Sequence, residues 1–265
     1  MNLDRQKYQE LAIFLINAEK EKREVIRLTS EIPDLTPEQA YQIQEELVNL
    51  KLANGHRIVG PKMGLTSFAK MQQMKVNEPI YGYVFDYMMV ESGGTISLSE
   101  LIHPKVEIEI AFFLGEDLEG PGITSAQVMS ATAYVAPALE IIDSRYKDFQ
   151  FTLPDVIADN ASSSRVVIGN KLTPVSSLTT DLELIGAVLY INGELKANGA
   201  GAAIVNHPAN SIAALANMLA RSGKKLHAGD IILAGAITEA IMLSNGDVVL
   251  GKLDQLGDVS FVVRD

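Results

Sequence analysis

Apolar residues recur at helical spacing in the first part of the chain and predict two helices there. Between positions 4 and 23 the apolar side chains fall on one helix face. They are Tyr8, Leu11, Ala12, Leu15 and Ile16. Thr36 is a predicted N-cap with Pro37 at the first helical position. We expect this second helix to end at the Asn54-Gly55 pair.

Beyond residue 57 the pattern changes to short runs rich in β-branched and aromatic residues, which predict strands. The runs are Arg57–Met63, Tyr81–Phe85, Val106–Leu114, Tyr134–Ile142, Val166–Ile168, Leu184–Ile191, Ile231–Leu233, Ala240–Leu243, Val248–Leu250 and Val259–Val263. Asn192-Gly193 and Asn245-Gly246 are typical of hairpin turns. One further helix is expected, from about Pro208 to Arg221. The balance of strands and helices predicts an α+β protein with a helical segment, residues 1–56, and a mixed β domain, residues 57–265.

Two glutamates stand two residues apart in one of these runs. Side chains alternate along a strand, so Glu107 and Glu109 share one face, roughly 7 Å apart. At an effective dielectric of about 20 their repulsion is roughly 2 kcal/mol. A cation between them would offset it, and Glu140 in another apolar run adds a third carboxylate. Three carboxylates without a thiol favour Mg²⁺ or Mn²⁺, although a Glu pair on an open sheet face also simply points into solvent.

The composition excludes several classes of protein. A formal charge of −11 argues against binding nucleic acid or an anionic membrane surface. The chain has no cysteine, which removes disulfides and thiolate chemistry and fits a cytoplasmic location. The start lacks an apolar signal core, and no run approaches the ~18 apolar residues of a membrane-spanning helix. A 47% hydrophobic content suffices for a sizeable core.

Five segments together are more specific than any single motif. They are residues 60–67 (GPKMGLTS), 79–82 (PIYG), 102–109 (IHPKVEIE), 137–146 (PALEIIDSRY) and 158–163 (ADNASS). In this order they resemble the hydratase/decarboxylase branch of the fumarylacetoacetate hydrolase superfamily. The resemblance runs from about Ile58 to the C-terminus, and the N-terminal helices look similar too. It implies a mixed β-sandwich or roll of the fumarylacetoacetate hydrolase type.

The resemblance also implies an activity. Decarboxylases of this branch convert 2-oxohex-3-enedioate to 2-hydroxypenta-2,4-dienoate and CO₂ in catechol meta-cleavage. Glu107, Glu109 and Glu140 would hold the Mg²⁺ or Mn²⁺ that binds the 2-oxo acid end. The chain would be a homo-oligomer and would associate with the sister hydratase. Besides a decarboxylase and the sister hydratase, a third hypothesis is a non-catalytic partner protein, but such a protein would not need all these residues.

Further site residues are carried over from the family. Lys62 is expected to be the catalytic lysine that offsets the negative charge of the site; the alternative is a surface lysine. Asn160, Ser162, Arg145 and Thr238 are expected to contact the substrate. For Arg145 an ion pair with Asp143 or Asp148 is an equal alternative, and for Thr238 a structural turn is the alternative.

One position separates the two sister reactions. Hydratases of the branch carry Asp where this chain has Ile80, and that acid serves their proton chemistry. The alternative function, 2-hydroxypenta-2,4-dienoate hydratase, therefore lacks an expected proton donor. The His–Glu pair of hydrolytic relatives is also missing, because the first histidine is His56. The chain departs from the decarboxylase pattern at Glu239, close to the expected site.

Overall fold

The computed structural model describes residues 3–265, and all of their side chains except that of Lys70. The two predicted N-terminal helices are confirmed as α1 (Arg5–Glu21) and α2 (Pro37–Ala53). Thr36 and Gln39 form a reciprocal capping box at the start of α2. A short helix, η1 (Leu28–Ser30), lies between α1 and α2.

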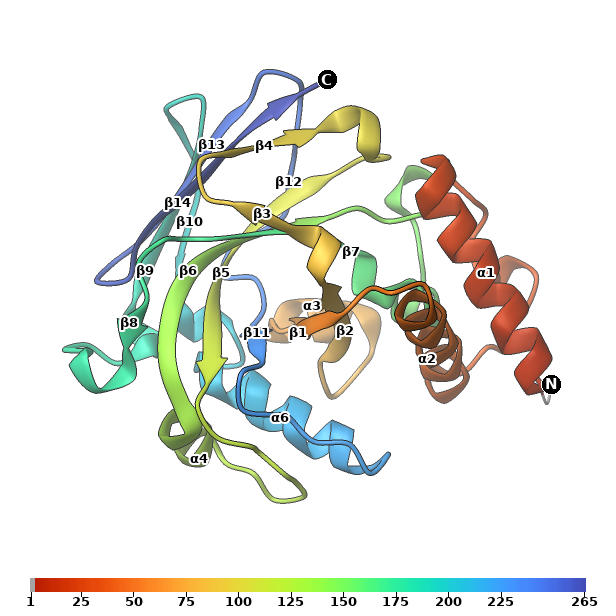
Figure 1. The fold of residues 1–265 in the computed structure, drawn as a ribbon, viewed down its shortest axis with the longest axis horizontal. Helices are drawn as coiled ribbons and strands as arrows, with labels where there is room; N and C mark the ends of the chain where they lie inside the picture. Colours follow the sequence, from red (N-terminus) through yellow and green to blue (C-terminus); the bar gives the residue numbers. More distant parts are fainter. Residues whose placement is uncertain (1–2) are drawn as a thin grey trace.

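The larger of two sheets has nine strands and carries the predicted metal ligands. Its order is β2-β1-β11-β5-β6-β7-β3, with β12 paired to β5 and β8 paired to β6. The strands are β1 (Ile58–Gly64), β2 (Ile80–Phe85), β3 (Met89–Glu91), β5 (Lys105–Leu114), β6 (Thr132–Ile142), β7 (Ser163–Ile168), β8 (Thr173–Pro174), β11 (Ile231–Leu233) and β12 (Ile241–Met242). In Figure 1, α1 and α2 lie together on the side of β2, away from the second sheet.

The second sheet has five strands in the order β10-β9-β13-β14-β4. They are β4 (Gly94–Ser97), β9 (Gly186–Ile191), β10 (Glu194–Ala200), β13 (Val248–Leu253) and β14 (Gly257–Arg264). The main hydrophobic core includes buried residues of both sheets, such as Ile108 and Phe261. At Gly251 a Cβ would lie 2.9 Å from the Ile108 side chain, so the two sheets approach each other closely there. The fold is thus α+β, as predicted.

Short helices complete the structure. They are α3 (Phe68–Met74), α4 (Ser125–Ala131), α5 (Leu153–Ala158) and α6 (Pro208–Ala220), with one-turn helices η2 (Asp86–Met88), η3 (Leu98–Glu100), η4 (Lys147–Phe149), η5 (Asn160–Ser162), η6 (Val175–Ser177), η7 (Leu182–Leu184) and η8 (Gly201–Ala203). A separate core joins α1 and α2 to α5 and includes Ile80 of β2. The N-terminal helices therefore pack against elements that surround the predicted site.

The ten predicted strand runs all contain strands, but one predicted hairpin is wrong. Asn192-Gly193 joins β9 to β10, with φ of 56° and 79° as a type I′ hairpin turn requires. Asn245-Gly246 does not join a hairpin. The strand before it, β12, pairs with β5 of the larger sheet, whereas β13 belongs to the smaller sheet. Here the chain crosses between sheets.

Candidate active site

Pairing of β5 with β6 brings the three predicted carboxylates together. Glu107 lies directly opposite Glu140, and Glu109 lies two residues further along β5. A carboxylate oxygen from each residue lies within 4.8 Å of the others. All three side chains are buried, with Glu109 and Glu140 fully so. The alternative of a solvent-facing Glu pair is therefore wrong.

Lys62 of β1 enters the same cluster. Its Nζ lies 2.9 Å from Glu140 Oε2 and donates to the backbone carbonyl of Ala161 at 3.1 Å. The residue is 2% exposed, so it is not a surface lysine. Burial alone would lower the pKa of Lys62, but the surrounding carboxylates, Glu140 foremost, raise the pKa above its ordinary value. Lys62 is therefore a buried cation.

The carboxylates keep unsatisfied oxygens inside the protein. Glu109 Oε2 accepts a hydrogen bond from the Gly235 N–H at 2.8 Å, while Glu109 Oε1 and Glu140 Oε1 have no hydrogen-bond partner. Burial and the Glu140 carboxylate raise the pKa of Glu109 well above its ordinary value, and burial raises that of Glu140. Buried unpaired carboxylate oxygens are costly unless a cation satisfies them. The residues present thus fit a hard divalent cation.

A strained turn lies against this cluster. Asn160, Ala161 and Ser162 have φ of 51°, 52° and 57°, the left-handed region. Such a conformation costs each of these residues about 1–2 kcal/mol. The Asn160 side chain holds the turn, since its Oδ1 accepts from Tyr83 N at 2.8 Å and its Nδ2 donates to Tyr83 O at 2.9 Å. A Cβ on Gly82 would lie 2.4 Å from the Asn160 carbonyl oxygen, so β2 approaches the turn closely.

The cluster opens into a cavity of about 1020 Å³. Lys62, Glu107, Ser162 and Thr238 line it, and Ser162 Oγ is buried without a hydrogen-bond partner. Its other lining residues include Arg27, Leu65, Met74, Ile80, Lys105, Phe149, Phe151, Asn198, Ile237 and Glu239. The cavity thus combines the buried carboxylate–lysine cluster with largely apolar walls, on which Arg27, Lys105 and Glu239 also lie. Thr238 also donates to the Glu239 carbonyl at 3.2 Å, so it has a bond within its own turn.

Two predicted substrate contacts do not line the cavity. Arg145 is 3% exposed, and its guanidinium is used internally. Its Nε pairs with Asp159, its Nη1 donates to the Asp143 carbonyl at 2.7 Å, and its Nη2 donates to the Asp159 carbonyl. Asn160 binds the backbone of β2 instead. The expected substrate contacts of Arg145 and Asn160 are thus corrected: both side chains hold the turn that carries Ser162.

Sequence reasoning missed most of the cavity wall. Lys105 could have been found, because it lies on the same strand face as Glu107 and Glu109 by the two-residue period. Arg27, Phe149 and Phe151 come from segments far away in sequence, and no local pattern marks them.

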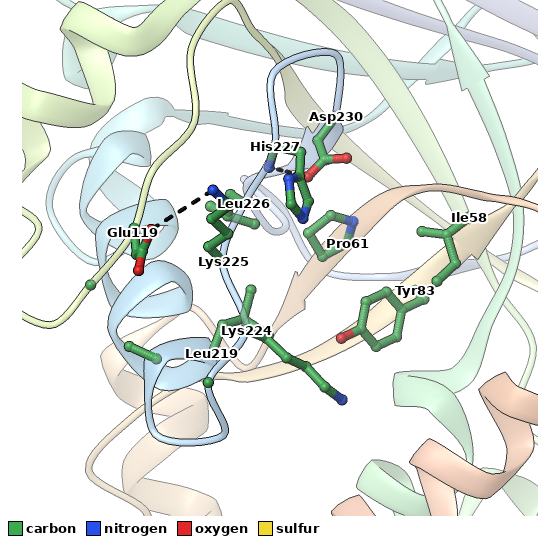
Figure 2. A pocket seen from close by; sticks show the side chains of 13 residues that line it. Ile58, Pro61, Tyr83, Glu119, Leu219, Lys224, Lys225, Leu226, His227 and Asp230 are labelled. Atoms are coloured by element: carbon green, nitrogen blue, oxygen red, sulfur yellow. Dashed lines mark hydrogen bonds and ion pairs between the residues drawn. The ribbon is translucent and has the colours of Figure 1, made fainter.

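A second pocket, of about 690 Å³, lies where the end of α6 and the following loop face the start of β1 (Figure 2). Lys225 lies 2.9 Å from Asp117 and 3.7 Å from Glu119, and Lys224 lies 2.8 Å from Glu45. These charges already have partners on the protein. Because none of the predicted site residues lines this pocket, the candidate active site is the carboxylate cavity.

The fold and the carboxylate site define a known family. Residues 60–264 match the model of the Fumarylacetoacetate (FAA) hydrolase C-terminal family. The chain belongs to the fumarylacetoacetate hydrolase family. Among residues 3–265, no helix combines the length and the apolar character needed to cross a membrane.

Its relatives include decarboxylases and hydratases. The chain is 45% identical to 4-oxalocrotonate decarboxylase of Pseudomonas sp. (strain CF600) over 97% of both chains. It is 40% identical to 2-keto-4-pentenoate hydratase of Paraburkholderia xenovorans (strain LB400), over 96% of this chain and 94% of the relative. A solved structure of 4-oxalocrotonate decarboxylase from Pseudomonas putida G7, complexed with magnesium and adipate, superposes with a TM-score of 0.96 at 42% identity and 99% coverage of each chain.

Proposed function

We propose that this chain is a metal-dependent decarboxylase that converts 2-oxohex-3-enedioate (4-oxalocrotonate) to 2-hydroxypenta-2,4-dienoate and CO₂ in catechol meta-cleavage. The main observation in support is the buried cluster of Glu107, Glu109, Glu140 and Lys62 beside a cavity with largely apolar walls. The decarboxylase relatives at 45% and 42% identity support the same reaction, and magnesium in one of them supports the metal.

The charged end of the cavity suits a 2-oxo acid. Glu107, Glu109 and Glu140 would hold Mg²⁺ or Mn²⁺, which supplies Lewis-acid stabilisation of charge at the 2-oxo oxygen when bound. Three carboxylates, a divalent cation and a dianionic substrate sum to −3, so the Lys62 ammonium reduces an excess of negative charge. The Lys62 ammonium also stabilises the negative charge that develops on the 2-oxo oxygen, and this oxygen then takes a proton from solvent to become the hydroxyl of the product. The buried Ser162 hydroxyl is available to orient the substrate.

The opposite end of the substrate loses CO₂. The electrons of the breaking C5–C6 bond form the C4–C5 double bond. The π electrons of the C3–C4 double bond move to C2–C3, and those of the C2–O double bond become the negative charge on the 2-oxygen. Ile80 lines the cavity and is 4% exposed. An apolar wall that excludes water from the leaving carboxylate favours its loss, and Ile80 cannot deliver a proton.

The alternative is hydration of 2-hydroxypenta-2,4-dienoate. It is favoured by the hydratase relative and by Glu239, an acid that lines the cavity and could act as a proton donor. The two reactions share the metal-bound 2-oxo acid, so the metal site does not separate them.

Purified protein with Mg²⁺ tests the proposal when it is given 2-oxohex-3-enedioate and CO₂ release is measured. We expect stoichiometric CO₂ and 2-hydroxypenta-2,4-dienoate, and no CO₂ from the Glu109→Gln variant. If the wild-type protein consumes no substrate while it binds Mg²⁺, the proposed function is wrong.

We also propose a cytoplasmic homo-oligomer that associates with the sister hydratase, with residues 1–56 serving as a helical segment on a catalytic domain, 57–265. The bacterial catabolic enzymes among its relatives support the location. Light scattering of the purified chain, alone and with the hydratase, measures both kinds of assembly; a monomer in both samples contradicts them.

A further inference from the structure

The cavity contains a lysine that the proposed chemistry at the metal end does not use. Lys105 begins β5, and its side chain is half-buried in the cavity wall. It stands two residues before Glu107, on the same strand face as Glu107 and Glu109, and therefore about 7 Å along the strand from Glu107. Among the described residues no carboxylate lies within ion-pair distance of its ammonium, unlike that of Lys62.

An aromatic ring holds the Lys105 ammonium instead. Its Nζ lies 4.0 Å from the centroid of the Phe149 ring, in the geometry of a cation–π contact. Phe149 also packs on the His103 ring, with centroids 5.0 Å apart. The ammonium is thus positioned by a ring that supplies no counter-charge, so its charge remains available to an anion in the cavity.

The segment that carries Phe149 is strained and tied down. Asp148 and Phe149 have φ of 55° and 58°, which is unfavourable for residues other than glycine. Glu24 fixes this segment, because its Oε1 accepts from Asp148 N at 3.0 Å and lies 3.0 Å from His103 Nδ1. Backbone strain maintained by surrounding contacts is typical of functional sites. The structure therefore holds the ring under Lys105 in advance of binding.

We propose that Lys105 binds the distal carboxylate of the substrate and makes the cavity selective for dianionic 2-oxo acids; this rests on the proposed function for the orientation of the substrate. Lys105 and Glu107 line the same cavity from one strand face, so a substrate whose 2-oxo acid end lies at the carboxylate cluster extends along the wall that carries the Lys105 side chain. Because the distal carboxylate becomes neutral CO₂, Lys105 stabilises the bound substrate more than the transition state. Lys105 is a specificity residue and does not drive the chemical step.

The test uses two inert probes with the same 2-oxo acid end. Of the two, only 2-oxohexanedioate has the distal carboxylate; 2-oxohexanoate lacks it. Neither has the C3–C4 double bond that would carry the electrons from CO₂ loss to the 2-oxo group, so neither is decarboxylated. Calorimetry with Mg²⁺ gives their Kd values for wild type, Lys105→Met and Lys105→Arg. Arg27→Met is the matched control, since Arg27 is another cation on the cavity wall and has no role in the proposed chemistry.

We expect Lys105→Met to weaken binding of 2-oxohexanedioate about 10- to 100-fold, as for a lost charged hydrogen bond. Binding of 2-oxohexanoate should change less than about 3-fold, and Lys105→Arg should retain the preference. Equal weakening of both probes would show that Lys105 only supports the cavity wall and would overturn the proposal. Loss of the preference in Arg27→Met instead would overturn it as well.

Turnover supplies a second readout. For 2-oxohex-3-enedioate, Lys105→Met should raise KM about 10- to 100-fold without lowering kcat. An unchanged KM with a lower kcat contradicts the proposal. If the protein proves not to decarboxylate this compound, the probe selectivity is still measurable, so failure of the function and failure of the Lys105 proposal are distinguishable.

Discussion

Replacing Lys62 with Met removes a buried charge while nearly conserving side-chain volume. Lys62 Nζ lies 2.9 Å from Glu140 Oε2, so their attraction is about 6 kcal/mol at an effective dielectric of ~20. Desolvation offsets part of this, and breaking a buried pair costs about 3–5 kcal/mol. The same ammonium stabilises the charge that develops at the 2-oxo oxygen, and losing one such group costs about 3–4 kcal/mol in the transition state, so turnover should fall about 10²- to 10³-fold.

The assay measures kcat with saturating Mg²⁺ and, separately, the Mg²⁺ affinity by calorimetry. A lysine ammonium repels a divalent cation, so Lys62→Met should bind Mg²⁺ at least as tightly as wild type. Lys196→Met serves as the control, because Lys196 pairs with Glu194 on an exposed strand. Near-normal kcat in Lys62→Met would refute the assigned role. Loss of Mg²⁺ binding in that variant would refute the charge argument.

EDTA should abolish activity and Mg²⁺ or Mn²⁺ should restore it, while Glu109→Gln weakens metal binding at unchanged circular dichroism; activity in metal-free protein contradicts this. Burial raises the pKa of Glu109 in the folded protein well above its ordinary value of 4.5. Metal-free protein should therefore become less stable as the pH rises from 4.5 to this raised pKa, because the unfolded chain releases the proton first. Thermal melts should show that Mg²⁺ suppresses this loss. Asn160→Ala should lower the free energy of unfolding by about 2 kcal/mol, because the Tyr83 N–H and carbonyl lose their hydrogen-bond partners. A raised KM at unchanged stability would show instead that Asn160 contacts the substrate. Arg145→Met should cost about 3–5 kcal/mol in denaturant melts, and unchanged stability would contradict its structural role.

Many helices and strands could be predicted from local sequence patterns. The predicted cap Thr36 acts within one helical turn, and the helix that it starts was predicted closely. The shared face of Glu107 and Glu109 likewise follows from the pleat of a single strand. Features of this kind depend on neighbours in sequence, so the sequence specifies them directly.

Features set by distant contacts were not predictable in the same way. The register that places Glu140 opposite Glu107 depends on pairing between separate strands. The three acids were grouped in advance by their chemistry and by the family resemblance, but no local pattern specified this register. The left-handed turn at Asn160–Ser162 contains no glycine, so nothing in its own sequence predicts it. Contacts with Tyr83 and Gly82 of β2 maintain the turn. Contacts between segments far apart in sequence likewise decide whether the side chains of Arg145 and Asn160 line the cavity.

We propose that this cavity removes CO₂ from a 2-oxo dicarboxylate and does not hydrate the resulting diene. The most direct measurement compares time courses on 2-oxohex-3-enedioate and 2-hydroxypenta-2,4-dienoate with one Mg²⁺-loaded preparation, beside an Ile80→Asp variant. We predict rapid CO₂ release with negligible 4-hydroxy-2-oxopentanoate from the wild type, and slower decarboxylation in Ile80→Asp. Hydration of the dienoate by the wild type at a rate comparable with decarboxylation would contradict the account.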